Sequence, residues 1–160
     1  PNSVLQTGEK RGLKEPRVIF RAFPFVNDNK HYGARIVFID RTSLFLTLGE
    51  RFQFQSAQER TNHLGSIVRL TTQGEPLSDN PFHSENFKPE IYSYGHRNIQ
   101  AAALDSTGRL WVAEMGPMGG DELNLIRKGG NYGWPVVSWG THYNGKKFLF
   151  LLRIRSLSTQ

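Results

Sequence analysis

Polar side chains and glycines gather in residues 92–135 more densely than elsewhere in the chain. Arg97 and Asn98 stand together near the start of this stretch. An arginine presents a planar fork of donors that matches carboxylates, and an asparagine adds a donor and an acceptor. The pair therefore suits an anionic, oxygen-rich ligand. A structural alternative stays open, in which Arg97 closes a turn by pairing with Glu114 or Asp121.

A glycine-dense loop, GPMGGDE, follows at residues 116–122. Proline has no N–H, and neighbouring glycines let backbone carbonyls turn toward a common point. Carbonyl oxygens beside carboxylates suit a hard cation such as calcium, although the spacing is not that of an EF-hand. The alternative is a tight turn in which Asp121 and Glu122 are solvated.

His31 follows the polar turn NDNK and shortly precedes Gly33, so it is expected at the entrance of a strand. The ordinary pKa of an imidazole suits a general base near neutral pH. The alternative is a histidine with a purely structural role. The remaining histidines show no metal-ligand spacing, and His96 is expected to shape its turn. The aromatic corner of Tyr132, Trp134 and Trp139 is expected to pack under a loop.

These side chains need a scaffold, and the hydrophobic pattern predicts one made of strands. The expected strands cover residues 18–20, 35–39, 44–48, 67–71 and 101–104, and residues 50–63 form a loop with about one helical turn. The chain also nearly repeats itself, since IDRTSLFLTLG at 39–49 resembles LDSTGRLWVAEMG at 104–116. A second strand ending in glycine follows each copy. This repetition predicts an all-β fold built from propeller-like four-stranded blades.

Composition limits the function classes. A chain of 160 residues makes one domain or part of a larger one. It has no cysteine, which excludes disulfides and thiolate metal sites. The net charge of +6 is spread along the chain, which argues against a nucleic-acid-binding face. No apolar run predicts a membrane span, no signal peptide is evident, and a start at Pro1 suggests that the natural start lies upstream.

Several motifs in order carry a family resemblance: KHYGARIVF at 30–38, LFLTLGE at 44–50, GHRN at 95–98, EMGPMGGDELN at 114–124 and KGGNYGWP at 128–135. Together they resemble the soluble pyrroloquinoline-quinone (PQQ) dehydrogenases, in particular the aldose sugar dehydrogenase branch of the glucose/sorbosone dehydrogenase family. The resemblance implies a six-bladed β-propeller, of which this chain would form about two to three blades. It also implies a periplasmic or secreted enzyme.

The resemblance implies the chemistry as well. Such enzymes oxidise the anomeric hydroxyl of an aldose to the lactone, pass hydride to PQQ and deliver the electrons to an external acceptor. By their match to the family motifs, His31 would be the general base, and Arg97 and Asn98 would contact PQQ.

The same resemblance implies calcium. The backbone carbonyls of Gly116 and Pro117 would hold a calcium ion bound to PQQ. Glu122 and Tyr132 would line a second, structural calcium site. PQQ carries three carboxylates, so an arginine and a divalent cation suit both its binding and its polarisation.

The sequence departs from the family in three ways. GHRN is followed by Ile99-Gln100-Ala101 where the family has Pro-Gln-Gly, and the chain is about half the family length. Residues 1–145 read as the partial propeller domain, whereas 146–160 do not resemble the family and suggest a frameshifted tail. Two further hypotheses therefore stay open: an inactive propeller fragment or non-enzymatic binding module, and a binder of anionic polymers.

Overall fold

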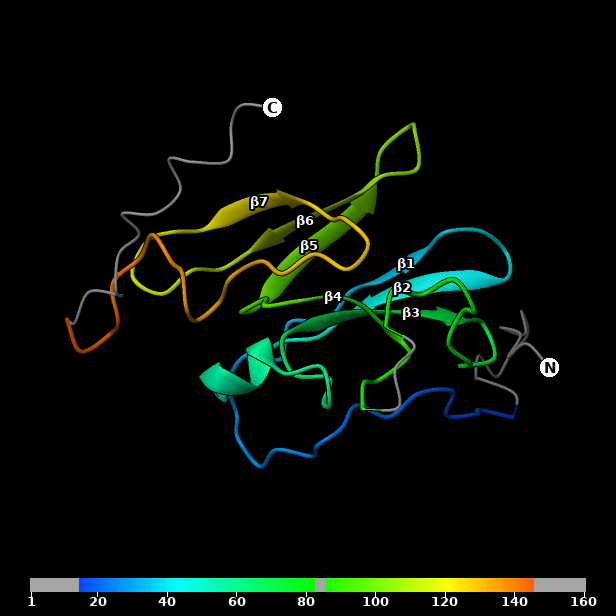
Figure 1. Ribbon diagram of the computed structural model, residues 1–160, viewed down its shortest axis with the longest axis horizontal. Helices are drawn as coiled ribbons and strands as arrows, with labels where there is room; N and C mark the ends of the chain where they lie inside the picture. The colour runs from blue at the N-terminus through cyan, green and yellow to red at the C-terminus, as the bar shows by residue number, and fades with distance from the viewer. Residues whose placement is uncertain (1–14, 83–85, 146–160) are drawn as a thin grey trace, which may run out of the picture.

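The structure is a computed structural model, and it describes residues 15–82 and 86–145. The described chain contains two antiparallel sheets and one short 3-10 helix, which confirms the all-β prediction (Figure 1). None of the helices in these ranges is long and apolar enough to cross a membrane. The frameshift hypothesis for residues 146–160 concerns a segment outside the described residues.

The first sheet has the strand order β1-β2-β3-β4. Its strands are β1 (Ile36–Phe38), β2 (Ser43–Thr47), β3 (Ser66–Thr71) and β4 (Ile91–Tyr94). The 3-10 helix η1 (Phe54–Gln58) lies between β2 and β3 and matches the single helical turn expected in residues 50–63. Three of the five predicted strands, at 35–39, 44–48 and 67–71, are thus confirmed with small shifts at their ends.

The second sheet has the order β5-β6-β7, and in Figure 1 it lies beside the first. Its strands are β5 (Ile99–Leu104), β6 (Leu110–Glu114) and β7 (Glu122–Leu125), so the strand expected at 101–104 is also confirmed. β5 pairs with β6 and β6 with β7, each antiparallel. The order of strands along the chain is therefore their order in each sheet, as in the blades of a propeller.

The internal repeat seen in the sequence has a structural basis at two hairpin turns. Oδ1 of Asp40 accepts the backbone N–H and the hydroxyl of Thr42 at 2.6 and 2.7 Å in the β1–β2 turn. Oδ1 of Asp105 accepts the same two groups of Thr107 at 2.9 and 2.7 Å in the β5–β6 turn. Each aspartate side chain closes its turn in the same way, so the two copies are equivalent units.

The core lies between the two sheets. It contains the buried side chains Phe45, Ile67, Ile99, Leu110, Val112 and Ile126. Each large apolar side chain of this kind contributes roughly 1.5–3 kcal/mol when it leaves water. Because both sheets supply members, this cluster fixes one sheet against the other, and with them the loops at the sheet ends.

One predicted strand is wrong. Residues 18–20 form no strand, and the segment runs as irregular backbone along the first sheet. Val18 is 62% exposed, whereas Phe20 packs on a second cluster formed by Leu44, Val68, Leu70 and Ile91. The backbone N–H of Phe23 donates to the ring Nδ1 of His63, and the carbonyl of Phe23 accepts the backbone N–H of His63, both at 2.7 Å. The packing of Phe20 and a few isolated hydrogen bonds therefore attach the segment to the sheet, without the regular hydrogen bonding of a strand.

Candidate functional site

Three connections meet at one end of the sheets. They are the loop before β1 with His31, the turn after β2 with Glu50, and the turn before β5 with Arg97 and Asn98. Oδ1 of the buried Asn98 side chain accepts the N–H of Gly33 at 2.8 Å, and the N–H of Glu50 donates to the carbonyl of Arg97 at 3.0 Å. Residues distant in sequence are thus joined by hydrogen bonds within one site.

Gly49 explains how closely these segments approach one another. A Cβ atom at this position would lie 2.1 Å from the carbonyl oxygen of His31 and 3.0 Å from Oδ1 of Asn98. Real Cβ atoms do not come this near to backbone oxygen, so only glycine fits. The close approach brings the His31 loop against the turn that carries Glu50.

The imidazole of His31 is held by a carboxylate. Nδ1 of His31 lies 2.5 Å from Oε2 of Glu50, which also accepts the N–H of Phe52 at 3.0 Å. The Glu50 side chain is fully buried and that of His31 is 10% exposed. A carboxylate on Nδ1 orients the ring, leaves Nε2 as the proton acceptor and stabilises the imidazolium that forms. A histidine held in this way has the geometry that a general base requires.

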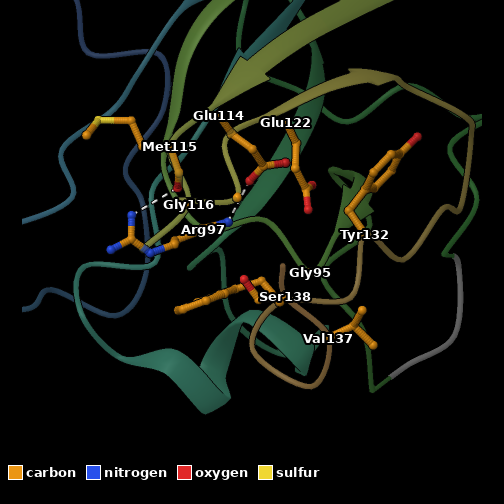
Figure 2. Close-up of a pocket in the computed structure, with 11 residues that line it drawn as sticks. Gly95, Arg97, Glu114, Met115, Gly116, Glu122, Tyr132, Val137 and Ser138 are labelled. Atoms are coloured by element: carbon orange, nitrogen blue, oxygen red, sulfur yellow. Dashed lines mark hydrogen bonds between the residues drawn. The ribbon is translucent and has the colours of Figure 1, made fainter. Parts of the chain in front are cut away.

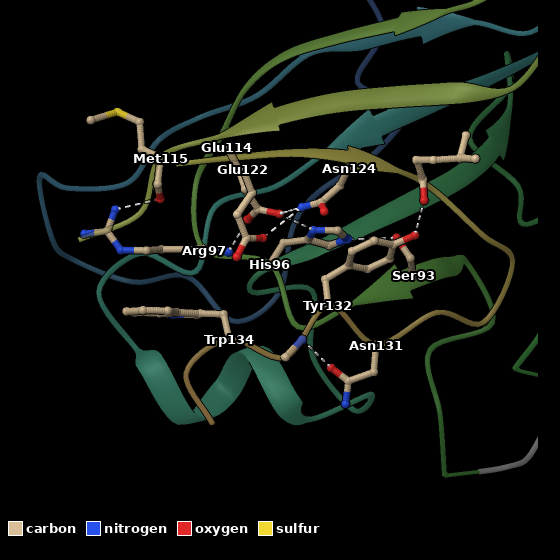
Figure 3. A network of polar contacts seen from close by, with 12 residues as sticks. Ser93, His96, Arg97, Glu114, Met115, Glu122, Asn124, Asn131, Tyr132 and Trp134 are labelled. Carbon is tan, nitrogen blue, oxygen red and sulfur yellow. Dashed lines mark hydrogen bonds and ion pairs between the residues drawn. The ribbon is translucent and has the colours of Figure 1, made fainter. Parts of the chain in front are cut away.

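Arg97 lies in the same region with its donors only partly used. Its guanidinium donates to the carbonyl of Met115 at 2.9 Å and to the hydroxyl of Tyr143 at 3.1 Å, and it lies 5.2 Å from the centre of the Trp134 ring (Figure 3). Nε of Arg97 is buried and has no hydrogen-bond partner within the described part of the chain. A buried donor without a partner is costly, so this atom fits an anionic ligand.

The structural alternative for Arg97 is not what the structure shows. In the part of the chain described here, no ion pair joins Arg97 to Glu114 or Asp121. The backbone N–H of Arg97, and not its guanidinium, donates to Oε2 of Glu114 at 2.8 Å. The turn is thus closed by the main chain, and the guanidinium faces elsewhere.

A buried polar cluster lies under this turn (Figure 3). Nδ1 of His96 lies 3.0 Å from Oε1 of Glu114, and Nε2 lies 2.9 Å from the hydroxyl of Ser93. Nδ2 of Asn124 donates to both Glu114 and Glu122, at 2.9 and 3.0 Å. Burial acts to raise the pKa of Glu114, but His96 and the hydrogen bonds outweigh it, so the pKa is lowered. His96 therefore shapes its turn, as expected.

Glu122 and Tyr132 lie at the edge of this cluster. Burial raises the pKa of Glu122, and the nearby charge of Glu114 adds to the increase. The ring of Tyr132 stacks on His96 at 4.5 Å, while its hydroxyl donates to the carbonyl of Leu125 and accepts the N–H of Arg127. Both hydrogen bonds of the Tyr132 hydroxyl are therefore with the backbone at the end of β7 and just after it.

The glycine-dense loop folds back on itself beside the cluster (Figure 2). The N–H of the buried Gly116 donates to Oδ1 of Asp121 at 2.9 Å. A Cβ at Gly116 would lie 2.3 and 2.4 Å from the carbonyl oxygens of Gly119 and Gly120. The loop therefore gathers several oxygen atoms, although no group of three His, Cys, Asp or Glu side chains within residues 15–82 and 86–145 could hold a metal.

A small cavity of about 10 Å³ separates this loop from the cluster. Its walls include Arg97, Glu114, Gly116, Glu122, Tyr132 and Trp134. Five predicted site residues are thus close together around one space or next to it: Arg97, Gly116, Pro117, Glu122 and Tyr132. His31 lines a separate cavity of about 170 Å³ and is connected to that group through Glu50, whose N–H donates to the carbonyl of Arg97. Asn98 follows Arg97 in the chain and joins it to the His31 loop by accepting the N–H of Gly33.

Sequence reasoning missed two contributors. Glu50 carries no signal in the sequence, because a glutamate after a strand-ending glycine is typical of a solvent-exposed position, whereas in the structure it is buried. Trp134 was assigned to packing, which is confirmed by its contact with Ala57 and Phe54, but its ring also lies beside the guanidinium of Arg97. For Trp139 the packing prediction is wrong, since that side chain is 70% exposed.

Comparison with known proteins gives consistent relatives. The Glucose / Sorbosone dehydrogenase family matches residues 3–150. Aldose sugar dehydrogenase YliI of Escherichia coli is 46% identical over 133 residues, which are 82% of this chain and 36% of that protein. Quinoprotein glucose dehydrogenase B of Acinetobacter calcoaceticus is 32% identical over 145 residues, covering 79% of this chain and 30% of that protein.

Solved structures agree. The apo-form of the soluble aldose sugar dehydrogenase of E. coli is 44% identical with a TM-score of 0.81, covering 84% of this chain and 40% of that one. The PQQ-bound aldose sugar dehydrogenase of Streptomyces coelicolor is 38% identical with a TM-score of 0.70, covering 85% of this chain and 38% of that one. The chain thus spans 36–40% of these E. coli and Streptomyces relatives.

These matches decide two predictions. The two sheets correspond to about 40% of the propeller of the E. coli enzyme, so the prediction of a partial, all-β propeller is confirmed. The resemblance to aldose sugar dehydrogenases is confirmed as well. The chain belongs to the Glucose / Sorbosone dehydrogenase family.

Proposed function

We propose that this chain carries the base and one side of the cofactor site of a PQQ- and calcium-dependent enzyme that oxidises the anomeric hydroxyl of an aldose to the lactone. The observation that supports this proposal most strongly is the His31–Glu50 pair. The backbone N–H of Glu50 also donates to the carbonyl of Arg97, which joins the pair to the turn of Arg97. The names of the relatives, an aldose sugar dehydrogenase and a quinoprotein glucose dehydrogenase, support the substrate class.

His31 performs the proton transfer in this proposal. Nε2 accepts the proton of the anomeric hydroxyl while the C–O bond becomes the carbonyl of the lactone. Glu50 keeps Nδ1 protonated and stabilises the imidazolium, because its buried carboxylate lies 2.5 Å away. When bound, PQQ supplies the redox chemistry by taking the hydride of the anomeric carbon and passing the electrons to an external acceptor.

The residues present fit a carboxylated quinone. Arg97 has a buried, unpartnered Nε and a planar group that lies beside Trp134. Arg97 and Asn98 would therefore contact PQQ, with the guanidinium directed to a carboxylate. This assignment needs no rearrangement of Glu114, which is already paired with His96.

The glycine-dense loop fits a calcium ion through its backbone. The carbonyls of Gly116 and Pro117 would hold the calcium that contacts PQQ, in a loop where other carbonyl oxygens and Asp121 are close by. Glu122 and Tyr132 would line a second calcium site. The raised pKa of Glu122 marks a carboxylate that is poorly solvated, and a bound cation would favour its charged form.

Because the chain spans about two fifths of its relatives, we also propose that activity requires the rest of the propeller, in the periplasm or outside the cell. The second candidate is an inactive propeller fragment or a non-enzymatic binding module. One assay separates the two candidates: dye reduction by an aldose in the presence of PQQ and calcium, with this chain and with a form extended at both ends.

Aldose-dependent dye reduction by the extended form supports the enzyme proposal. If the 160-residue chain reduces no dye in the same assay, that chain is an inactive part of an active protein. Absence of reduction in the extended form, with PQQ shown to be bound by its absorbance, overturns the proposal. Two control reactions are run: one without aldose, and one in which a chelator replaces calcium.

A further inference from the structure

The turn after β2 directs two adjacent side chains onto the loop that carries His31. Arg51 and Phe52 have positive φ values of 54° and 63°, which non-glycine residues rarely adopt. This backbone places the carboxylate of Glu50 on the imidazole of His31 and sends the guanidinium of Arg51 to the main chain of the same loop. Two neighbours in sequence therefore hold one loop from two sides.

Within the described residues, the side-chain hydrogen bonds and the ring contact of Arg51 are with residues 26–32. Nε donates to the carbonyl of Lys30 at 2.9 Å, and Nη2 donates to the carbonyls of Asp28 and Val26. The guanidinium also lies 3.4 Å from the centre of the Tyr32 ring. The Tyr32 hydroxyl in turn donates to the carbonyl of Asp28 at 2.7 Å. One planar cation thus connects alternate carbonyls of the loop and the ring next to His31.

The loop needs this support because His31 itself is in a disfavoured conformation. Its φ is 53°, in the left-handed region that favours glycine. Within the described chain no strand pairs with residues 26–32. Apart from its bonds to Glu50 and Arg51, the loop is held by short-range contacts such as Lys30 N–H to Oδ1 of Asp28. A lysine has no planar fork and could satisfy fewer of these carbonyls at once.

We propose that Arg51 is a positioning residue for the reaction: it holds the main chain of residues 26–32 so that His31 keeps its contact with Glu50 and presents Nε2 to substrate. In this inference Arg51 acts through His31, by holding its loop, and takes no part in the proton transfer itself. The inference rests on the proposed function for its effect on turnover, but not for its effect on the imidazole.

The first test reads the imidazole without cofactor. NMR spectra of the ring signals of His31 are compared in the wild-type chain and in Arg51→Lys and Arg51→Met, with Arg60→Met as the matched control. Arg60 also stacks on aromatic rings, at 4.1 Å from the centre of that of Phe87, and its ring contacts in the described chain are with Phe82, Phe87 and Tyr94, not with the His31 loop. In the Arg51 variants, but not in Arg60→Met, we expect loss of the NMR signals that report the hydrogen bond between Nδ1 of His31 and Glu50. We also expect hydrogen exchange of the backbone amides of residues 28–33 to become faster by about tenfold or more.

The second test uses turnover in the extended form. Arg51→Lys is expected to lower kcat by about tenfold or more while KM changes by less than about threefold, because only the base is misplaced. In a His31→Gln background the same substitution is expected to have no further effect, since residues that act through one another are not additive.

An unchanged His31 spectrum in both Arg51 variants, or additive effects in the double variant, would overturn the inference. If Arg51→Met does not fold, Arg51→Lys retains the cation and still decides the question. Absence of aldose oxidation in the wild-type extended form would refute the proposed function, whereas the NMR comparison would still decide whether Arg51 positions the imidazole.

Discussion

Nδ1 of His31 lies 2.5 Å from Oε2 of Glu50, although the two residues come from different connections of the first sheet. The fold contains a second pair with the same separation, Nε2 of His63 and Oε1 of Glu90, which attaches the segment before β1. His63 and His31 line one cavity, but only the His31–Glu50 pair has a role in the proposed proton transfer. This gives every substitution at Glu50 a natural control.

Glu50→Gln should lower kcat of the extended form by about a hundredfold or more with little change in KM, because an amide cannot stabilise the imidazolium. Glu90→Gln should leave kcat within about twofold of wild type, since its histidine takes no part in proton transfer. Steady-state kinetics with a saturating dye measure both. Equal losses in the two variants would mean that Glu50 acts only on stability.

The pH dependence of stability should depend on Glu90. Partial burial acts to raise its pKa, but the hydrogen bond from His63 and the backbone keep the pKa below its ordinary value of 4.5. Its stabilising contribution is therefore complete above that pH and is lost as the pH falls through the folded-state pKa.

Thermal unfolding of wild type and Glu90→Gln between about pH 3 and pH 7 should show a difference in Tm that is largest near neutrality and shrinks below about pH 4.5. Arg69 and Asp79 form an ion pair elsewhere in the sheet, and the lowered pKa of Asp79 affects wild type and variant equally. A Tm difference that grows in acid would contradict the assignment.

The polar cluster under the Arg97 turn should be a strong stability determinant. Glu114→Ala would leave His96, the N–H of Arg97 and the Asn124 amide without their shared acceptor in a buried setting. Loss of such a partner costs roughly 3 kcal/mol. Urea unfolding followed by tryptophan fluorescence measures this. A cost below about 1 kcal/mol would show that water replaces the carboxylate.

The glycine-dense loop should tolerate alanine at one position and not at another. Gly116→Ala places a methyl group within 2.4 Å of two carbonyl oxygens, whereas at Gly119, with a φ of 80°, no atom lies within 4 Å. We expect Gly116→Ala to weaken binding of PQQ with calcium by about tenfold or more. Gly119→Ala should cost only the strain of its backbone, roughly 1 kcal/mol of stability.

Titration of each variant with PQQ at fixed calcium, followed by absorbance, distinguishes the two substitutions. Calorimetry without PQQ reports whether calcium alone binds to the loop. Similar PQQ affinity in the two alanine variants would mean that the Gly116 carbonyl is not a ligand.

Several features of the fold and of the candidate site are visible in the sequence for identifiable reasons. The repeat at 39–49 and 104–116 can be recognised in the sequence because the same aspartate and threonine, two positions apart, close each turn. Arg97 and Asn98 stood out as a donor pair within a turn. By contrast, Glu50 and Arg51 act on His31 across the fold, and no local pattern reports such a contact.

The failed strand at 18–20 has a related cause. Apolar and β-branched residues favour a strand only if a partner strand is available, and here the backbone of Phe23 instead pairs with His63. Likewise, the exposure of Trp139 depends on how the chain after Trp134 runs, which composition does not reveal.

The most direct measurement is turnover of His31→Gln in the extended form with PQQ, calcium and an aldose. The account predicts that kcat falls by about a hundredfold to ten-thousandfold, while PQQ binding stays within about threefold of wild type. Retention of wild-type kcat in a variant that binds PQQ normally would contradict the assignment of His31 as the base.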